Sequence, residues 1–85
     1  MVSKKVVVTN TSGFHVRPAG VLAKTAESCD SKVEIRFGHN IVNAKSLLNI
    51  LSASIRMGDE IVLSCDGPNE VEDLKKMLDT MNKLE

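Results

Sequence analysis

The sequence predicts an α+β fold in which a four-stranded, mostly antiparallel sheet is covered on one face by three helices. Stretches in which apolar and polar residues alternate are interleaved with stretches in which apolar residues recur at helical spacing. The connections between strand-like stretches suit hairpins, and long crossovers are few. The predicted order is strand, helix, strand, strand, helix, strand, helix. Its first six elements also match the split βαβ pattern, so the strand topology stays open at this level.

Length and composition limit what the chain can do. The 85 residues suffice for one domain, residues 1–85, with a single core. Eleven basic residues balance eleven acidic ones, and two Phe with no Trp or Tyr offer no platform for stacking bases. A module that binds RNA is therefore disfavoured.

No apolar run reaches the roughly 20 residues of a membrane span, and no signal-peptide pattern opens the chain. We expect a cytoplasmic monomer that binds no nucleic acid and does not insert into a membrane.

The first strand is expected over residues 2–8, which are rich in β-branched side chains, with Val6 and Val8 on one face. Residues 9–13 are polar and turn-like, and they lead into a helix that runs to about Ser28. Apolar residues at i, i+3, i+4 and i+7 mark its buried face: Ala19, Leu22, Ala23 and Ala26.

A hairpin should follow the first helix. Residues 32–37 alternate strictly, which predicts a strand whose buried side carries Val33, Ile35 and Phe37. A two-residue turn, Gly38-His39, then leads into a short strand over residues 40–43. His39 is expected at the exposed tip of this turn, without a catalytic role.

The second helix is expected from Leu47 to about Ser54, with Ser46 as its N-cap. This segment has too many aliphatic residues for one narrow stripe: Leu47, Leu48, Ile50, Leu51 and Ile55. Either all of them belong to the core, or some form an exposed patch on which a partner docks. The sequence alone does not choose between these alternatives.

The last third of the chain predicts a strand and a closing helix. Residues 60–66 alternate, with Ile61, Leu63 and Cys65 on one face. Asn69 and Glu72 resemble a capping box at the start of the helix. Its core-facing stripe is expected to consist of six apolar residues: Val71, Leu74, Met77, Leu78, Met81 and Leu84.

The two cysteines, Cys29 and Cys65, lie 36 positions apart and are expected to be reduced packing residues. Neither they nor His15 and His39 show the paired spacing of a zinc site. The sequence therefore predicts neither a metal site nor a cofactor.

The stretch from Gly13 to Gly20 carries the strongest chemical signal. It places His15 and Arg17 at the start of the first helix, where unpaired N–H groups and the positive end of the helix dipole favour an anion. Pro18 is tolerated in a first turn. The Arg17 guanidinium matches phosphate oxygens two at a time, and an imidazole is a competent nucleophile. These features favour a phosphohistidine site, and the alternative is a polar helix cap beside a solvated arginine.

Two separated motifs in the expected order resemble the HPr family, the histidine-containing phosphocarriers of the bacterial phosphoenolpyruvate-dependent sugar phosphotransferase system. Residues 13–19 are similar to the family's active-site stretch, Gly-(Leu or Phe)-His-x-Arg-Pro-Ala. Residues 43–48, Asn-Ala-Lys-Ser-Leu-Leu, are similar to its second signature, and residues 58–61 resemble the entry to its last strand. The resemblance covers essentially the whole chain and implies an open-faced β-sandwich.

The resemblance also implies specific roles. His15 would accept a phosphoryl group on Nδ1 from enzyme I and pass it to sugar-specific enzyme IIA domains, with Arg17 and the helix start around Val16 and Pro18 holding the group. The chain itself would be a carrier and not an enzyme. Ser46 would be the target of an HPr kinase/phosphorylase, and the seryl-phosphorylated form would act with a catabolite control regulator. The residues that dock partners would be Leu47, Leu48, Leu51 and Lys24.

Four positions depart from the family pattern. Asn49 stands where many relatives carry glycine, and Ala53-Ser54 replaces a common Leu-Gly at the end of the second helix. The missing glycine removes an easy left-handed C-cap, so we expect a helix exit that is distorted or less stable. Glu27 stands where a basic residue often helps to bind enzyme I. These departures leave the histidine motif intact, and a regulatory module that acts mainly through Ser46 remains the alternative function.

Overall fold

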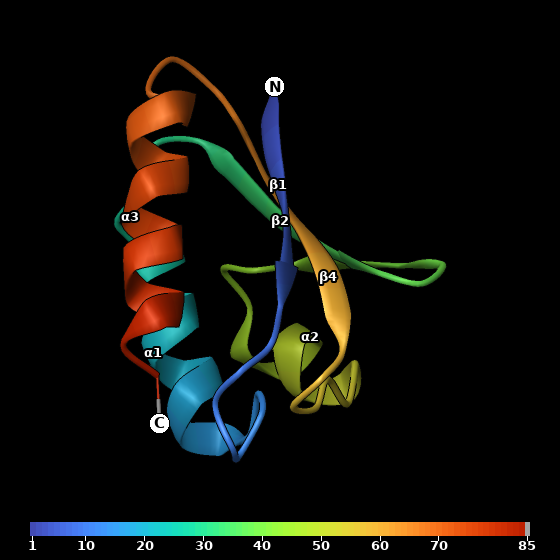
Figure 1. Ribbon diagram of the computed structural model, residues 1–85. Coiled ribbons are helices and arrows are strands. Elements are labelled where there is room, and N and C mark those ends of the chain that lie inside the picture. Colours follow the sequence, from blue (N-terminus) through green and yellow to red (C-terminus); the bar gives the residue numbers. More distant parts are fainter. Residues whose placement is uncertain (85) are drawn as a thin grey trace.

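The computed structural model describes residues 1–84. Their helices and strands follow the predicted order: β1 (Val2–Val7), α1 (Val16–Glu27), β2 (Lys32–Phe37), β3 (Asn40–Asn43), α2 (Leu47–Ser52), β4 (Glu60–Asp66) and α3 (Glu70–Asn82). Figure 1 shows α1 and α3 side by side along the sheet, with α2 beside the end where α1 begins. The fold is an open-faced α+β arrangement, as the sequence predicts.

The strands form one sheet in the order β1-β4-β2-β3, and every neighbouring pair is antiparallel. Because β4 lies between β1 and β2, those two strands run parallel without touching. This arrangement is the split βαβ unit, and it resolves the topology that the sequence left open. The register pairs Leu63 with Lys4 on one side and with Ile35 on the other. The hairpin turn at Gly38-His39 is as predicted, and Gly38 has a φ of +61°.

The core lies between the helices and one face of the sheet. All four residues predicted for the buried face of α1 are buried, as are Ile61, Leu63 and Cys65 in β4. Val33 and Ile35 are buried in β2, whereas Phe37 is half-buried at its end. Alternation leaves polar side chains on the other face, where Lys5 pairs with Glu60 at 3.8 Å and Lys32 with Glu34 at 3.6 Å. Such exposed pairs contribute little to stability.

The start of α3 differs from the prediction in two ways. Asn69 forms no side-chain cap, and its amide donates to the Asp30 carboxylate at 2.9 Å, so the capping box is wrong. Glu70 instead accepts from the Gly67 N–H at 3.2 Å. Val71 was placed in the core stripe but is 53% exposed. Met77 and Met81 are buried as predicted, and Leu74, Leu78 and Leu84 are half-buried.

Asp73 takes a buried position on α3 because Ser31 satisfies its carboxylate. Its Oδ2 atom accepts from the Ser31 N–H at 3.0 Å and from the Ser31 hydroxyl at 2.6 Å. A buried carboxylate is tolerated only with such partners. The two hydrogen bonds tie α3 to the segment between α1 and β2. Helical periodicity of apolar residues could not reveal this contact, because its two residues are 42 positions apart.

Helix α2 ends at Ser52, two residues before the predicted end. The reason lies in Ser54, whose φ of +55° is in the left-handed region that L-residues other than glycine rarely adopt. The exit from α2 therefore keeps the left-handed conformation common at helix ends, with Ser54 in a conformation that costs a serine more than a glycine. Ser46 caps the helix as predicted, because its hydroxyl accepts from the Asn49 N–H at 3.2 Å.

The Asp73–Ser31 contact predicts a pH dependence of stability. The Ser31 hydroxyl holds the pKa of Asp73 below its ordinary value, so the stabilisation is present at neutral pH and disappears as the pH falls below about 4. We expect Asp73→Asn to lower the free energy of unfolding at pH 7 by about 1–3 kcal/mol in urea titrations. The loss should shrink at pH 3. Asp79→Asn, at an exposed position of the same helix, is the control, and an equal effect of both variants would contradict this role.

Candidate functional site

His15 is the N-cap residue of α1, with an extended backbone (φ −72°, ψ −178°) and an exposed side chain. Its carbonyl accepts from the Ala19 N–H at 2.8 Å, but its imidazole makes no capping hydrogen bond. Within residues 1–84 the ring forms no hydrogen bond, so its nitrogens are open to an incoming group. His15 therefore occupies the N-cap position without a side-chain capping hydrogen bond.

The start of α1 offers two backbone donors beside this ring. The N–H groups of Val16 and Arg17 belong to the first turn and have no acceptor within the helix, whereas Pro18 has no N–H. Arg17 is exposed and forms no ion pair with any residue from 1 to 84. A planar guanidinium and two N–H groups near an exposed imidazole can hold the oxygens of a phosphoryl group. The structure thus brings together the site residues that the sequence singled out around His15.

The loop before α1 fixes the position of His15. The Phe14 N–H donates to the Ile55 carbonyl at 3.0 Å, and the Phe14 ring is buried. Gly13 has a φ of +60°, and a Cβ atom there would lie 2.8 Å from both Arg56 Cα and the Ile55 carbonyl oxygen. The Asn10 side-chain amide donates to the Gly13 carbonyl at 2.7 Å from a buried position. Two loops thus meet at a point where only glycine fits, and His15 follows two residues later.

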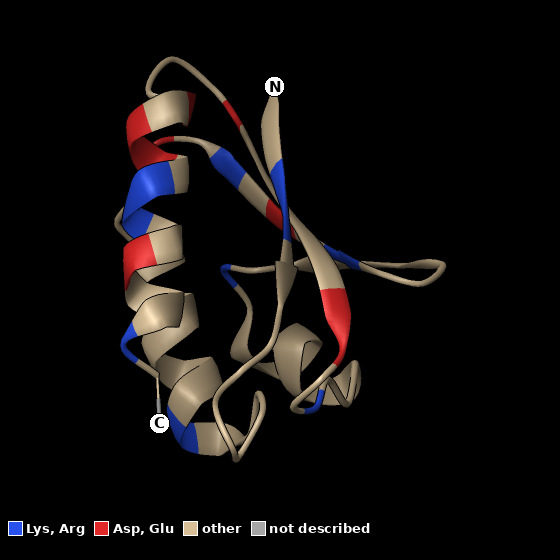
Figure 2. Ribbon diagram, in the orientation of Figure 1, with Lys and Arg blue, Asp and Glu red and all other residues tan. Residues whose placement is uncertain are grey.

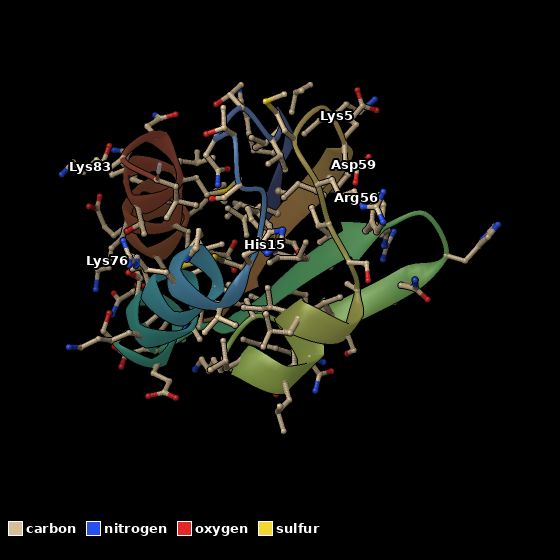
Figure 3. The ribbon with its side chains drawn as sticks, turned by 90° about the horizontal axis from the view of Figure 1, so that it is seen from below. Lys5, His15, Arg56, Asp59, Lys76 and Lys83 are labelled. Atoms are coloured by element: carbon tan, nitrogen blue, oxygen red, sulfur yellow. The ribbon has the colours of Figure 1, made fainter. Side chains whose placement is uncertain are left out.

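His15 lies between two hollows. The groove between α1 and α3 has a volume of about 710 Å³ and is lined by Ser12, His15, Val16, Arg17, Pro18, Val21, Thr25, Thr80, Lys83 and Leu84. The hollow on the other side, between α1 and the exit of α2, has a volume of about 390 Å³ and is lined by Phe14, His15, Val16, Leu51, Ser54, Ile55 and Arg56. Figure 3 shows His15 between the end of α3, which carries Lys83, and the loop that carries Arg56.

Three cationic side chains line the two hollows beside the ring. Arg17 and Lys83 line one hollow and Arg56 lines the other, and no carboxylate lines either one among the described residues. Figure 2 shows blue and no red where α1 begins and α3 ends. The sequence alone does not indicate a role for Arg56 or Lys83. No local motif marks them, because they are distant from His15 in the chain and approach it only through the fold.

Ser46 is half-exposed on the surface that includes α2. Its hydroxyl oxygen accepts from the Asn49 N–H at 3.2 Å and from the Asn49 side-chain amide at 3.0 Å. Some aliphatic residues of this segment belong to the core and others are exposed, so each of the two alternatives holds for part of the segment. Ile50 and Ile55 belong to the core, whereas Leu47 and Leu48 are 37% and 76% exposed and Leu51 is half-buried. We call Leu47, Leu48 and Leu51 the leucine patch.

The remaining candidate residues play no part in this site. Cys29 and Cys65 are buried free thiols, and burial raises the pKa of Cys65 to about 11, which keeps that thiol protonated. His39 is exposed in the hairpin turn. Within the described part of the chain, no group of three or more His, Cys, Asp and Glu side chains could hold a metal ion. No described helix is long and apolar enough to cross a membrane.

The close approach at Gly13 predicts a matched pair of glycine variants. Gly13→Ala would place a methyl group against backbone atoms at a left-handed position, and we expect a loss of about 2–5 kcal/mol in unfolding free energy. Gly20→Ala, inside α1 with open space around it, should instead gain about 0.5–1 kcal/mol. Urea denaturation of both variants measures this difference. If Gly13→Ala were as stable as the wild type, the loop contact would not fix the site.

Comparisons with known proteins show the family of the chain. The family model described as "PTS HPr component phosphorylation site" matches residues 2–83. The HPr of Thermoanaerobacter tengcongensis is 30% identical, with 96% of this chain and 92% of that chain covered and a TM-score of 0.92. The phosphocarrier protein HPr of Bacillus anthracis is 29% identical, with 93% and 94% covered and a TM-score of 0.88. The catabolite repression protein Crh of Bacillus subtilis, a swapped dimer, is 31% identical, with 98% and 95% covered and a TM-score of 0.77. The chain belongs to the HPr family of phosphocarrier proteins of the phosphotransferase system.

Proposed function

We propose that His15 of this chain accepts a phosphoryl group from enzyme I and passes it to a sugar-specific enzyme IIA domain. The observation that carries this proposal is the exposed imidazole, which makes no hydrogen bond within residues 1–84 and stands at the start of α1. The family supports it, because its members are phosphocarriers. A carrier needs a nucleophile that two different partners can reach in turn, and an exposed N-cap position provides this access.

The chemistry is a pair of displacements at phosphorus. In the first, Nδ1 of the neutral His15 ring forms a bond to phosphorus while the bond between phosphorus and the donor protein breaks. In the second, a nucleophile of the acceptor attacks and the N–P bond breaks, which returns the imidazole. Arg17 and the N–H groups of Val16 and Arg17 are placed to stabilise the charge on the phosphoryl oxygens in both steps.

In this proposal the chain acts as a substrate of other proteins and not as an enzyme. Catalytic groups of enzyme I and of the acceptor complete each transfer, and the carrier supplies a nucleophile and fixed positive charge. The leucine patch and Lys24 are the proposed docking residues, since exposed aliphatic side chains beside a reactive group suit a transient protein interface. We propose that the chain acts as a monomer, unlike the swapped Crh of Bacillus subtilis.

Phosphorylation by enzyme I with radiolabelled phosphoenolpyruvate tests the carrier function. We expect one acid-labile, base-stable phosphate per wild-type chain and none on His15→Ala. Arg17→Ala should keep the acceptor but slow its phosphorylation by about ten- to a hundredfold, which corresponds to the loss of about 1.5–3 kcal/mol from charge-assisted hydrogen bonds. His39→Ala controls for the second imidazole. Equal labelling of His15→Ala and the wild type would contradict the proposal.

A second candidate function is regulation through phosphorylation of Ser46. The hydroxyl is half-exposed next to Leu47, and the chain is also similar to Crh, a catabolite repression protein. A phosphate there would add about −1.5 to −2 charges beside the leucine patch and would repel an acidic docking face. An HPr kinase/phosphorylase would supply the modification, and a catabolite control regulator would bind the product. The two functions are compatible, because Ser46 and His15 are separate groups.

Incubation with ATP and an HPr kinase/phosphorylase tests the Ser46 proposal. Mass spectrometry should find one phosphate on the wild type and on His15→Ala, and none on Ser46→Ala. Ser52→Ala removes a second hydroxyl of α2 and should leave the modification unchanged, which makes it the matched control. A phosphate retained on Ser46→Ala, or no phosphate on the wild type, would contradict this second function while leaving the His15 transfer untouched.

A further inference from the structure

The groove between α1 and α3 opens beside His15 but on the opposite side from the leucine patch. It runs along α1 from its start to Thr25 and is closed on the other side by the end of α3 and the residues that follow it. Nothing in the proposed transfer chemistry uses its far wall, which consists of Thr80, Lys83 and Leu84. At about 710 Å³ it is larger than the hollow on the α2 side. A recess of this size next to a group that must meet other proteins calls for an explanation.

The groove has a fixed floor and apolar walls. The Thr80 hydroxyl donates to the Thr25 hydroxyl at 3.2 Å, which links the two helices across the floor. The Thr25 hydroxyl also contacts the Val21 carbonyl, one turn earlier in α1, at 3.0 Å. Val21 is 46% exposed on one wall, and Leu84 is half-buried on the other. An aliphatic side chain from outside could therefore bury surface here without any rearrangement of the helices.

The described part of the groove rim carries two cationic side chains. Arg17 and Lys83 line it from opposite helices, both are exposed, and neither forms an ion pair within residues 1–84. The acidic residues at the start of α3 (Glu70, Glu72 and Asp73) lie at the other end of that helix. The lining contains no carboxylate among the described residues. A partner that fits this charge pattern must present a carboxylate close to an aliphatic side chain.

We propose that this groove is a second docking element for the protein that phosphorylates His15, and that it receives a protruding segment of that protein. An aliphatic side chain of the segment packs on Val21 and Leu84, and an acidic side chain pairs with Lys83, which leaves Arg17 to the phosphoryl oxygens. The inference rests on the proposed function, since the ring of His15 lines both the groove and the hollow on the α2 side. A protein face that reaches this ring from the α1–α3 side covers the mouth of the groove.

Nuclear magnetic resonance on the intact chain tests the location of the interface. The ¹⁵N-labelled wild type is titrated with unlabelled enzyme I, and amide signals are followed. We expect Val21, Thr80, Lys83 and Leu84 to shift in step with Val16 and Arg17. Shifts at Val16 and Arg17 without shifts on α3 would overturn the groove proposal alone. Equal shifts of the α3 amides with inorganic phosphate would also overturn it, by indicating a site for small anions. No shift at any residue would overturn the proposed function as well.

A charge-reversal pair measures the contribution of the rim. Lys83→Glu should raise the KM of enzyme I for this chain three- to tenfold with kcat unchanged, because it removes docking and not chemistry. The effect should weaken as ionic strength rises. Lys75→Glu makes the same change in net charge on an exposed position of α3 outside the groove lining, and it should leave KM unchanged. Equal KM values for the two variants would overturn the proposal.

Discussion

The contact between the loop at Gly13 and the loop at Ile55 is the constraint on which the site depends. A backbone approach of this kind tolerates no Cβ atom, and it lets the Phe14 N–H reach the Ile55 carbonyl at 3.0 Å. With Phe14 held in the core, the next residue must leave it, and α1 begins there. His15 is exposed because its neighbour is buried. The exposure of the imidazole thus follows from the packing of Phe14 in the core.

The rest of the fold keeps the surroundings of this ring fixed. Asp73 binds Ser31 at the far end of α1, and Thr80 binds Thr25 nearer to the ring. These polar contacts set how α3 lies along α1, and so they set the width of the groove beside His15. On the other side, Ser54 adopts a left-handed conformation that turns the chain out of α2 toward Ile55. The loop that follows α2 therefore contains both the strained residue Ser54 and the backbone atoms of Ile55 and Arg56 that pack against Gly13.

The sequence predicted most of the fold because its strands alternate cleanly and its first helix has a regular apolar face. The bounds of β2, β3 and β4 agree with the prediction, since hydrophobic periodicity decides strands that are buried on one face. Sequence patterns did not predict the partner of Asn69, which is Asp30, 39 positions away. They also did not predict the burial of Asp73, which depends on Ser31. They identified the His15 motif and the Ser46 cap because both are local. The sequence did not indicate the other residues of the two hollows, Arg56, Thr80 and Lys83, because only tertiary packing brings them there.

The central claim is that an imidazole held outward at the start of α1 carries the phosphoryl group at one defined nitrogen. The most direct measurement is ¹⁵N and ³¹P NMR of the chain after reaction with enzyme I and phosphoenolpyruvate. We expect a single phosphorus resonance, coupled to Nδ1 of His15, with the ring of His39 unchanged. A phosphate on His39, or on a residue other than histidine, would contradict it.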